Sequence, residues 1–334
     1  MIRPRVLLLG ALGLVTAGVA IGSCAPPLEQ PWQLTDFRVL GVGVEPPEPA
    51  RGTDVRVTLA YADVRNRPVQ VVWIACTVPL TGGGTTGGSD GGIDGGLDAG
   101  TTGGTPGCTI VSPPGSPFPL PDVRTTVTVH IPATGGSQDS SGRETITLLG
   151  FACAGGSIGL ASDGGTTPTC TGANARGWSF TRSIRIHDPR ATDPPNANPH
   201  VSEVRFGPDG TTYPLTSQNQ PTLRVCTGAQ GSATCPAYVF EVGFTDGSRE
   251  TYHASDLSDG ALVVVQRTER ITTGFAITRG TLAGAFRTDS SATPVSTMQD
   301  VFYAPETAGD IHLFVYATDG RGGFDATDRY LHVQ

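Results

Sequence analysis

The residues that could do chemistry in this chain are few and widely spaced. Two G-x-S-x-G strings are centred on Ser89 and Ser157. Such a serine acts as a nucleophile when it sits on a sharp turn between a strand and a helix, but no helical pattern follows either string. The six histidines are scattered singly, and only His187 has a neighbouring carboxylate, that of Asp188. We therefore predict that the chain is not an enzyme and has no catalytic residues.

Acidic residues offer a second kind of site, because calcium prefers oxygen ligands. The string SDGGIDGGLDAG spaces Asp90, Asp94 and Asp98 four residues apart. It has neither the EF-hand loop nor the nonapeptide repeat of calcium-binding proteins, so we interpret it as solvated low-complexity sequence. Asp319 and Asp325 lie near a glycine-rich turn, where an aspartate that caps its own backbone is favoured over a calcium ligand. The sequence predicts no metal and no cofactor.

Six cysteines lie where predicted strands give way to loops. They are Cys76, Cys108, Cys153, Cys170, Cys226 and Cys235. Pairing them in sequence order would clamp the base of three loops, and this is the pairing we favour. The alternative joins Cys76 to Cys153 across a sandwich and Cys108 to Cys170 between two insertions. Zinc binding by thiolates is disfavoured because the chain has no C-x-x-C pair.

The amino-terminus has the pattern of a secretory signal peptide. Arg3 and Arg5 precede an apolar run over residues 6–21, which is too short to span a bilayer comfortably. The run ends in Ile21-Gly22-Ser23-Cys24, which resembles the lipobox of bacterial lipoproteins. The resemblance implies cleavage before Cys24 and a lipid anchor on its thiol. An ordinary secreted protein is the alternative, although Ser23 to Ala25 fits its cleavage site poorly.

Two further expectations follow from this leader. Seven cysteines less a lipidated Cys24 leave an even six, as expected for disulfides in an oxidising compartment. Ala25, rather than an aspartate, follows the cysteine, and by resemblance to lipoproteins of Gram-negative bacteria this implies the outer membrane. We therefore expect the membrane, reached through the lipid anchor, to be a partner of the mature chain.

Composition limits both the fold and the partners. The chain of 334 residues has 46 Gly and 27 Pro, which leaves little room for long helices. All 22 basic residues are arginine, so lysine nucleophiles and Schiff bases are excluded. The formal net charge is -8 and no basic stripe is visible in the sequence, which argues against a nucleic acid partner.

Short alternating segments rich in β-branched and aromatic residues predict strands throughout the chain. In the first half they are residues 37–44, 54–61, 69–77, 125–131, 144–153 and 178–186. In the second half they are residues 201–206, 222–227, 238–245, 250–254, 261–268, 275–277, 300–303, 311–318 and 330–333. The sequence therefore predicts an all-β fold.

The strand pattern also predicts the domain organisation. We expect a signal peptide over 1–23, a proline-rich tether over 24–35, a first β-sandwich over 36–187, a linker over 188–200 and a second β-sandwich over 201–334. Two insertions interrupt the first sandwich, a glycine-rich one at 81–107, which cannot bury enough apolar surface to fold, and a milder one at 154–176.

Two stretches resemble bacterial immunoglobulin-like and PKD-like modules. FRVLGVGVEPPEPARGTDVRVTLAY is similar to their opening strands, and IHLFVYATDGRGGFDATDRYLHV is similar to their closing hairpin. The resemblance implies two tandem immunoglobulin-like sandwiches. Trp73 and Cys76 stand together on one strand, unlike the cysteine–tryptophan–cysteine order of antibody domains, so no inter-sheet disulfide is assumed.

Taken together, these patterns lead us to expect a non-catalytic envelope lipoprotein that binds, adheres or scaffolds at the outer membrane. The alternative is an accessory subunit of a hydrolase or secretion complex that recognises carbohydrate or peptidoglycan, with Trp32 and Trp178 as candidate exposed platforms. A serine hydrolase built on Ser157 is the third hypothesis. Envelope proteins or glycans are the expected partners.

Overall fold

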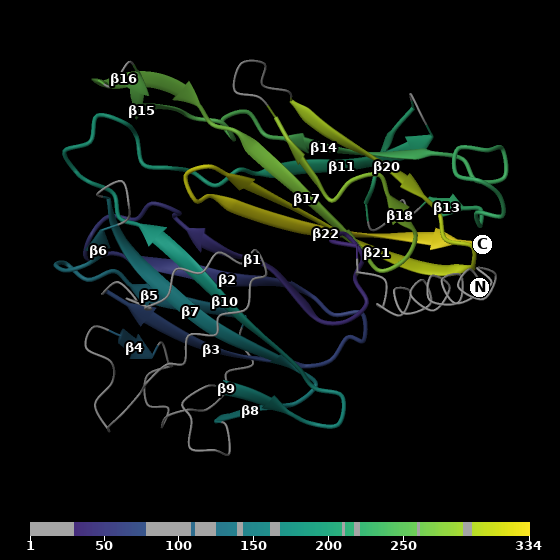
Figure 1. Ribbon diagram of the computed structural model, residues 1–334, viewed down its shortest axis with the longest axis horizontal. Helices are drawn as coiled ribbons and strands as arrows, with labels where there is room; N and C mark the ends of the chain where they lie inside the picture. Colours follow the sequence, from purple (N-terminus) through teal and green to yellow (C-terminus); the bar gives the residue numbers. More distant parts are fainter. Residues whose placement is uncertain are drawn as a thin grey trace, which may run out of the picture. The chain divides into compact units, whose positions relative to one another are not determined.

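The computed structural model describes most of the chain beyond the leader (Figure 1). Described are residues 30–77, 108–110, 125–138, 143–160, 168–208, 211–216, 221–258, 261–289 and 296–334. The predicted signal peptide and Cys24 lie outside these ranges, as do Ser89, Asp90, Asp94, Asp98 and the glycine-rich insertion. Within them, no helix is long and apolar enough to cross a membrane.

The all-β fold expected from the sequence is confirmed. The described part of the chain contains strands and no helix, and most pairings are antiparallel. Residues Trp32–Gln334 form one compact unit. In Figure 1 the strands of its first half run from purple to teal and those of its second half from teal through green to yellow.

The first half of the unit consists of two sheets that share one core. One has the order β1-β2-β5, and the other has the order β10-β7-β3-β4, with β6 beside β7. Their bounds are β1 Arg38–Glu45, β2 Asp54–Ala62, β3 Val69–Cys76, β4 Cys108–Ile110, β5 Thr126–His130, β6 Ser137–Gln138, β7 Glu144–Ala154 and β10 Arg176–Arg185. In β2, Val55, Val57 and Leu59 are buried between exposed neighbours, so strict alternation builds the core face.

The second half also has two sheets around one core. Their orders are β12-β11-β14-β20-β18 and β13-β22-β21-β17-β19. Their bounds are β11 Val201–Pro208, β12 Tyr213–Pro214, β13 Thr222–Leu223, β14 Tyr238–Phe244, β17 Ile271–Ile277, β18 Thr281–Leu282, β19 Phe286–Thr288, β20 Thr297–Tyr303, β21 Gly309–Asp319 and β22 Phe324–Val333. The rings of Phe206, Phe240 and Phe302 pack against one another at its centre.

Two small hairpins stand apart from these sheets. β15 (Thr251–Ser258) and β16 (Ala261–Thr268) pair with each other, as do β8 (Ser157–Leu160) and β9 (Pro168–Thr171). The second hairpin lies inside residues 154–176, where the sequence showed only an insertion. Its strands are only four residues each, which is too short for an alternating pattern to stand out from the surrounding loop.

Three disulfides clamp the loops of the described chain. They join Cys76 to Cys108, Cys153 to Cys170 and Cys226 to Cys235. These are the sequential pairs favoured above, and the cross-sandwich alternative is absent from the structure. Cys76 and Cys108 are also directly opposed in the β3–β4 pairing, so this bond fixes the point where the glycine-rich insertion returns to the sheet.

The end of the predicted tether is part of the folded unit. Gln33 forms a parallel bridge to Ile277 at the end of β17. Two backbone hydrogen bonds of 2.8 Å hold this bridge, from the Leu34 N–H to the Ile277 carbonyl and from the Ile277 N–H to the Trp32 carbonyl. The chain therefore contacts the second pair of sheets before it enters the first.

Candidate functional site

The two pairs of sheets meet at a junction whose first side is apolar. The ring of Phe324, at the start of β22, covers Gly41 and Gly43 of β1. A Cβ atom added to Gly41 would lie 2.2 Å from Cε2 of that ring, so only glycine permits this approach. A small core of Leu34, Ala62, Ala276 and Phe314 lies in the same region.

Polar groups lock the backbone beside this apolar contact. Nδ2 of Asn198 donates to the Val44 carbonyl at 2.8 Å, while Oδ1 of Asn198 accepts the Phe324 N–H at 2.9 Å. Arg182 of β10 also donates to the carbonyl of Gly322. One linker asparagine and one arginine thus tie both pairs of sheets together.

The turn between β21 and β22 is built around Asp319. Its Oδ1 accepts the backbone N–H groups of Arg321, Gly322 and Gly323 at 2.8, 2.7 and 2.7 Å. This is the self-capping turn favoured above over a calcium site. Asp325 is engaged elsewhere, since its Oδ2 accepts the Val201 N–H at 2.8 Å.

The same turn directs Arg321 into the second, polar side of the junction. Its guanidinium lies 2.9 Å from Oε2 of Glu48, 3.1 Å from Oε2 of Glu250 and 3.3 Å from Oε1 of Glu269. It also donates to the Pro194 carbonyl at 3.2 Å. Glu48 belongs to the loop after β1, Pro194 belongs to the linker, and Glu250 and Glu269 belong to the second half of the unit. The Arg321 side chain, which is 6% exposed, therefore joins all three regions.

This cluster holds more carboxylates than cations, and this excess affects the protonation of the carboxyl groups. Burial, reinforced by the negative charge of Asp319, raises the pKa of Glu269 to about 7 despite the opposing effect of Arg321. Burial likewise raises the pKa of Glu250. The cluster therefore contains a carboxyl group that changes charge near neutral pH.

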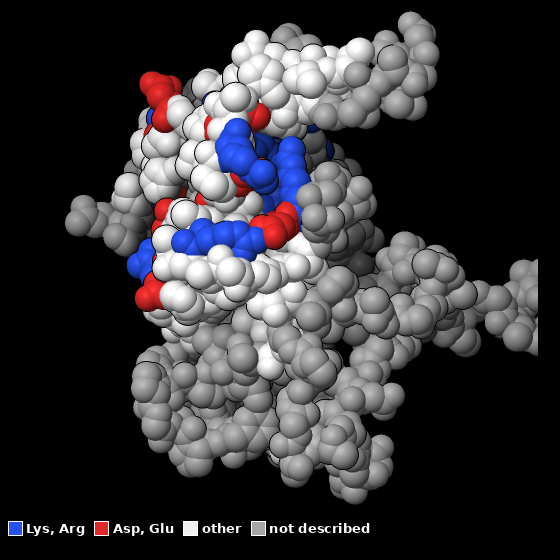
Figure 2. Space-filling view, turned by 90° about the vertical axis from the view of Figure 1, so that its left-hand side faces the viewer, with Lys and Arg blue, Asp and Glu red and all other residues white. Residues whose placement is uncertain are grey.

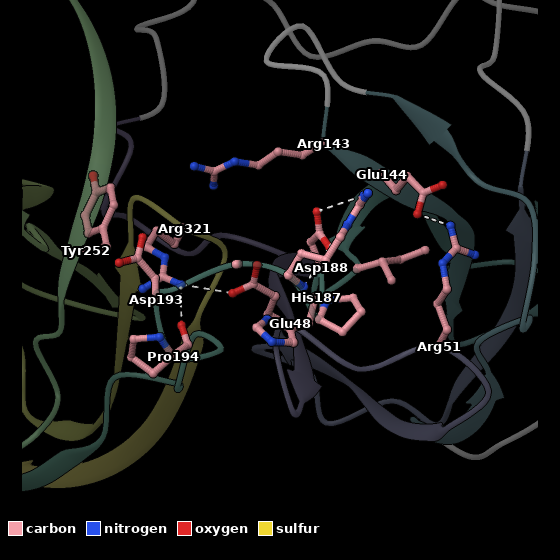
Figure 3. Close-up of a pocket in the computed structure, with 14 residues that line it drawn as sticks. Glu48, Arg51, Arg143, Glu144, His187, Asp188, Asp193, Pro194, Tyr252 and Arg321 are labelled. Atoms are coloured by element: carbon pink, nitrogen blue, oxygen red, sulfur yellow. Dashed lines mark hydrogen bonds and ion pairs between the residues drawn. The ribbon is translucent and has the colours of Figure 1, made fainter. Parts of the chain in front are cut away.

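A cleft of about 610 Å³ opens beside Arg321 (Figure 3). Its walls come from the loop after β1, the start of β7, the linker and β15. Tyr252 of β15 lies at one end, with the Arg321 guanidinium 5.1 Å from its ring centre. Tyr252 also lines an adjoining pocket of about 410 Å³.

Exposed arginines line these two cavities. Arg143 and Arg190 line the cleft, while Arg267 and Arg270 line the adjoining pocket; all four are exposed. Arg190 pairs with Asp188 at 3.1 Å. Figure 2 shows several arginine side chains gathered on one face of the molecule, with acidic side chains next to them.

The residues singled out from the sequence lie elsewhere. Ser157 is exposed at the start of β8, so it begins a strand rather than occupying a turn into a helix. Trp178 is 41% exposed on the edge strand β10. Trp32 is half-buried and packs against the second core.

Five histidines find carboxylate partners that their sequence neighbours did not reveal. The pairs are His130–Asp54, His200–Asp325, His253–Asp193, His312–Asp328 and His332–Asp310. The pair adjacent in sequence behaves differently, since Asp188 bonds to Arg190. Within the ranges that the structure describes, no three His, Cys, Asp or Glu side chains are grouped to hold a metal ion.

Comparison with known proteins adds no identity. No protein family model matches the sequence, and no curated protein matches it either. The class that the coordinates define is an all-β protein with sandwich-like pairs of sheets and disulfide-clamped loops.

Proposed function

We propose that the chain is a non-catalytic binding protein of the cell envelope, in which two tandem immunoglobulin-like sandwiches form one fixed frame. The observation that carries this proposal is the junction. Phe324 against Gly41 on one side and Arg321 among three glutamates on the other hold both sandwiches together. A frame held at two sides can present loops from both halves to one partner in a constant geometry.

The proposed location is the outer membrane, reached through a lipid on Cys24. The sequence pattern Ile21-Gly22-Ser23-Cys24 supports the anchor. The three disulfides support an oxidising compartment, because such bonds persist outside the cytosol. Acyl chains on Cys24 would then supply the membrane affinity that an anionic protein does not have by itself.

The anchor is tested by feeding labelled palmitate to cells that express the wild-type chain or Cys24→Ala. We expect label only on the wild type, together with removal of residues 1–23 and release of Cys24→Ala from membranes. A Ser157→Ala chain serves as control and should be labelled like the wild type. An untrimmed chain in the cytosol with six reduced cysteines would contradict the proposal.

The binding role is tested by cross-linking in intact cells followed by mass spectrometry. We expect cross-links from loops around the junction to one recurrent envelope component. Arg321→Gln should reduce these cross-links, because it loosens the frame, whereas the exposed Arg224→Gln should not. Cross-links that scatter over the surface without preference would contradict a binding module.

A carbohydrate-recognising accessory subunit is the second candidate. Two aromatic rings favour it, namely the exposed Trp178 on β10 and the half-buried Tyr252 in the cleft. A hydrolase built on Ser157 is the remaining candidate. It predicts that Ser157→Ala abolishes an activity in a broad esterase and peptidase screen, and our proposal predicts no such loss.

A further inference from the structure

Exposed arginines gather around the junction cleft, although the chain as a whole is anionic. The protein carries a formal net charge of -8, yet Arg143, Arg190, Arg267 and Arg270 are all exposed around the cleft and the adjoining pocket. We call these four residues the arginine rim. Because like charges repel, four cations on one rim indicate a site for anionic groups.

The shape of the guanidinium group also indicates which kind of anion the arginine rim would bind. Each guanidinium carries five N–H donors in a planar fork. The fork matches the two oxygens of a carboxylate, which a lysine ammonium does not. Arg190 shows this on the protein itself, since its Nε and Nη2 donate to the two oxygens of Asp188 at 3.1 and 3.4 Å.

Carboxylates line the cleft together with these arginines. They belong to Asp188, Asp193 and Glu144, and a carboxylate accepts hydrogen bonds from hydroxyl groups. Tyr252 adds a flat apolar ring supported by Arg321. The combination of donors, acceptors and one ring is suited to a ligand that carries hydroxyl groups, carboxylates and apolar ring faces.

An extended peptide is less suited to this cleft, because the nearest strand edge is already occupied. Oδ2 of Asp193 accepts the His253 N–H at 2.9 Å, and its Oδ1 lies 2.6 Å from Nδ1 of the same histidine. A linker side chain therefore caps β15 at the point where a peptide would add as a new strand.

From these observations we propose that the junction cleft and the arginine rim bind an acidic oligosaccharide, a chain of sugar rings that bear carboxylates. One ring packs on Tyr252 while its hydroxyl groups bond to the acidic walls. Carboxylates of neighbouring rings bind the rim. This inference rests on the proposed binding role and names the ligand class for it.

The test measures binding of the full mature chain to defined probes by titration calorimetry. The probes are tetragalacturonate, neutral maltotetraose, inorganic phosphate and a short DNA duplex. We expect tetragalacturonate to bind at least tenfold more tightly than maltotetraose, with affinity that falls as salt rises. Tighter binding of phosphate or DNA, equal binding of both sugars, or no binding of tetragalacturonate would overturn the proposal.

Variants then locate the site. Arg143→Gln, Arg267→Gln and Arg270→Gln should each weaken tetragalacturonate binding about fivefold to tenfold, whereas the exposed Arg224→Gln, with the same change of charge, should have little effect. Tyr252→Ala should weaken it as much and Tyr252→Phe should restore it. The site would be overturned if the rim variants and Arg224→Gln lost the same amount of affinity for tetragalacturonate, or if Tyr252→Ala bound it normally. Thermal unfolding verifies the fold of each variant. If the sugar fails to bind while cross-links in cells still converge on the junction, the binding role stands and only the ligand class falls.

Discussion

The two sides of the junction hold the same sandwiches together by different physics. On the apolar side, Phe324 lies against the bare backbone of Gly41 and Gly43. On the polar side, Arg321 is buried among Glu48, Glu250 and Glu269. Shape complementarity is insensitive to pH and salt, whereas a buried cluster with excess carboxylates responds to proton concentration. The apolar side is therefore expected to hold the two pairs of sheets together at any pH, whereas the stability of the polar side, next to the cleft, is expected to depend on pH.

The largest effect should follow from removing the cation of the polar side. Arg321→Gln leaves Glu48, Glu250 and Glu269 without their shared partner, and breaking a buried ion pair in this way costs about 3–5 kcal/mol. Urea denaturation measures the change in the free energy of unfolding. The exposed Arg224→Gln is the control, and an equally small loss in both variants would show that the cluster contributes little.

The apolar side should respond nearly as strongly. Phe324 is 8% exposed, so Phe324→Ala should cost about 3 kcal/mol through lost burial and the cavity that remains. Phe286 is 52% exposed, and Phe286→Ala should cost less than about 1 kcal/mol. If both alanine variants unfold at the same urea concentration, the Phe324 ring does not stabilise the junction more than an exposed ring does.

Two neighbouring glycines give a finer test of the same contact. A Cβ at Gly41 would lie 2.2 Å from the Phe324 ring, whereas one at Gly43 would lie 3.5 Å from it, which is ordinary contact. Gly41→Ala should therefore destabilise the chain by about 1–3 kcal/mol through overpacking, and Gly43→Ala by clearly less. The reverse order in thermal or urea unfolding would contradict the close approach of β22 to β1.

The last prediction concerns the pH dependence that Glu269 gives to the polar side and that the apolar side does not have. Its pKa is raised from 4.5 to about 7 in the folded chain, so the folded state holds the proton that the unfolded state releases. Its stabilising contribution is complete below pH 4.5 and is lost as pH rises through about 7, by at most about 1.4 kcal/mol per pH unit.

Glu269→Gln should remove this part of the pH dependence, while Phe324→Ala should keep it. Unfolding measured at several pH values between 4.5 and 8 separates the two variants. Parallel stability curves for the wild type and Glu269→Gln would exclude Glu269 as the titrating group.

Strand positions could be predicted well from the sequence, and contacts between distant strands could not. In β2 the period-two pattern of Val55, Val57 and Leu59 reports burial directly. The Asp319 turn was equally readable, because aspartate and glycine have local conformational preferences. The strands β8 and β9 gave no such signal, since each is only four residues long.

The candidate site was missed because its members are far apart in the chain. Glu48 and Arg321 meet across most of the sequence, and each alone looks like an ordinary surface charge. One signal was available: Gly41 and Gly43 occupy alternate positions of a strand and therefore share a face, which is typical of close approach by another element. That pattern located a contact but not the partner, which was Phe324.

The bridge between Gln33 and Ile277 has a consequence for how the molecule is made. The segment around Gln33 is synthesised well before the strand that receives it, because Ile277 follows far along the chain. Until then Leu34, which is 2% exposed in the finished fold, has no place to be buried. The bridge can therefore form only after β17 has been made, and a second pair of sheets produced in isolation from residue 201 onwards would lack this contact.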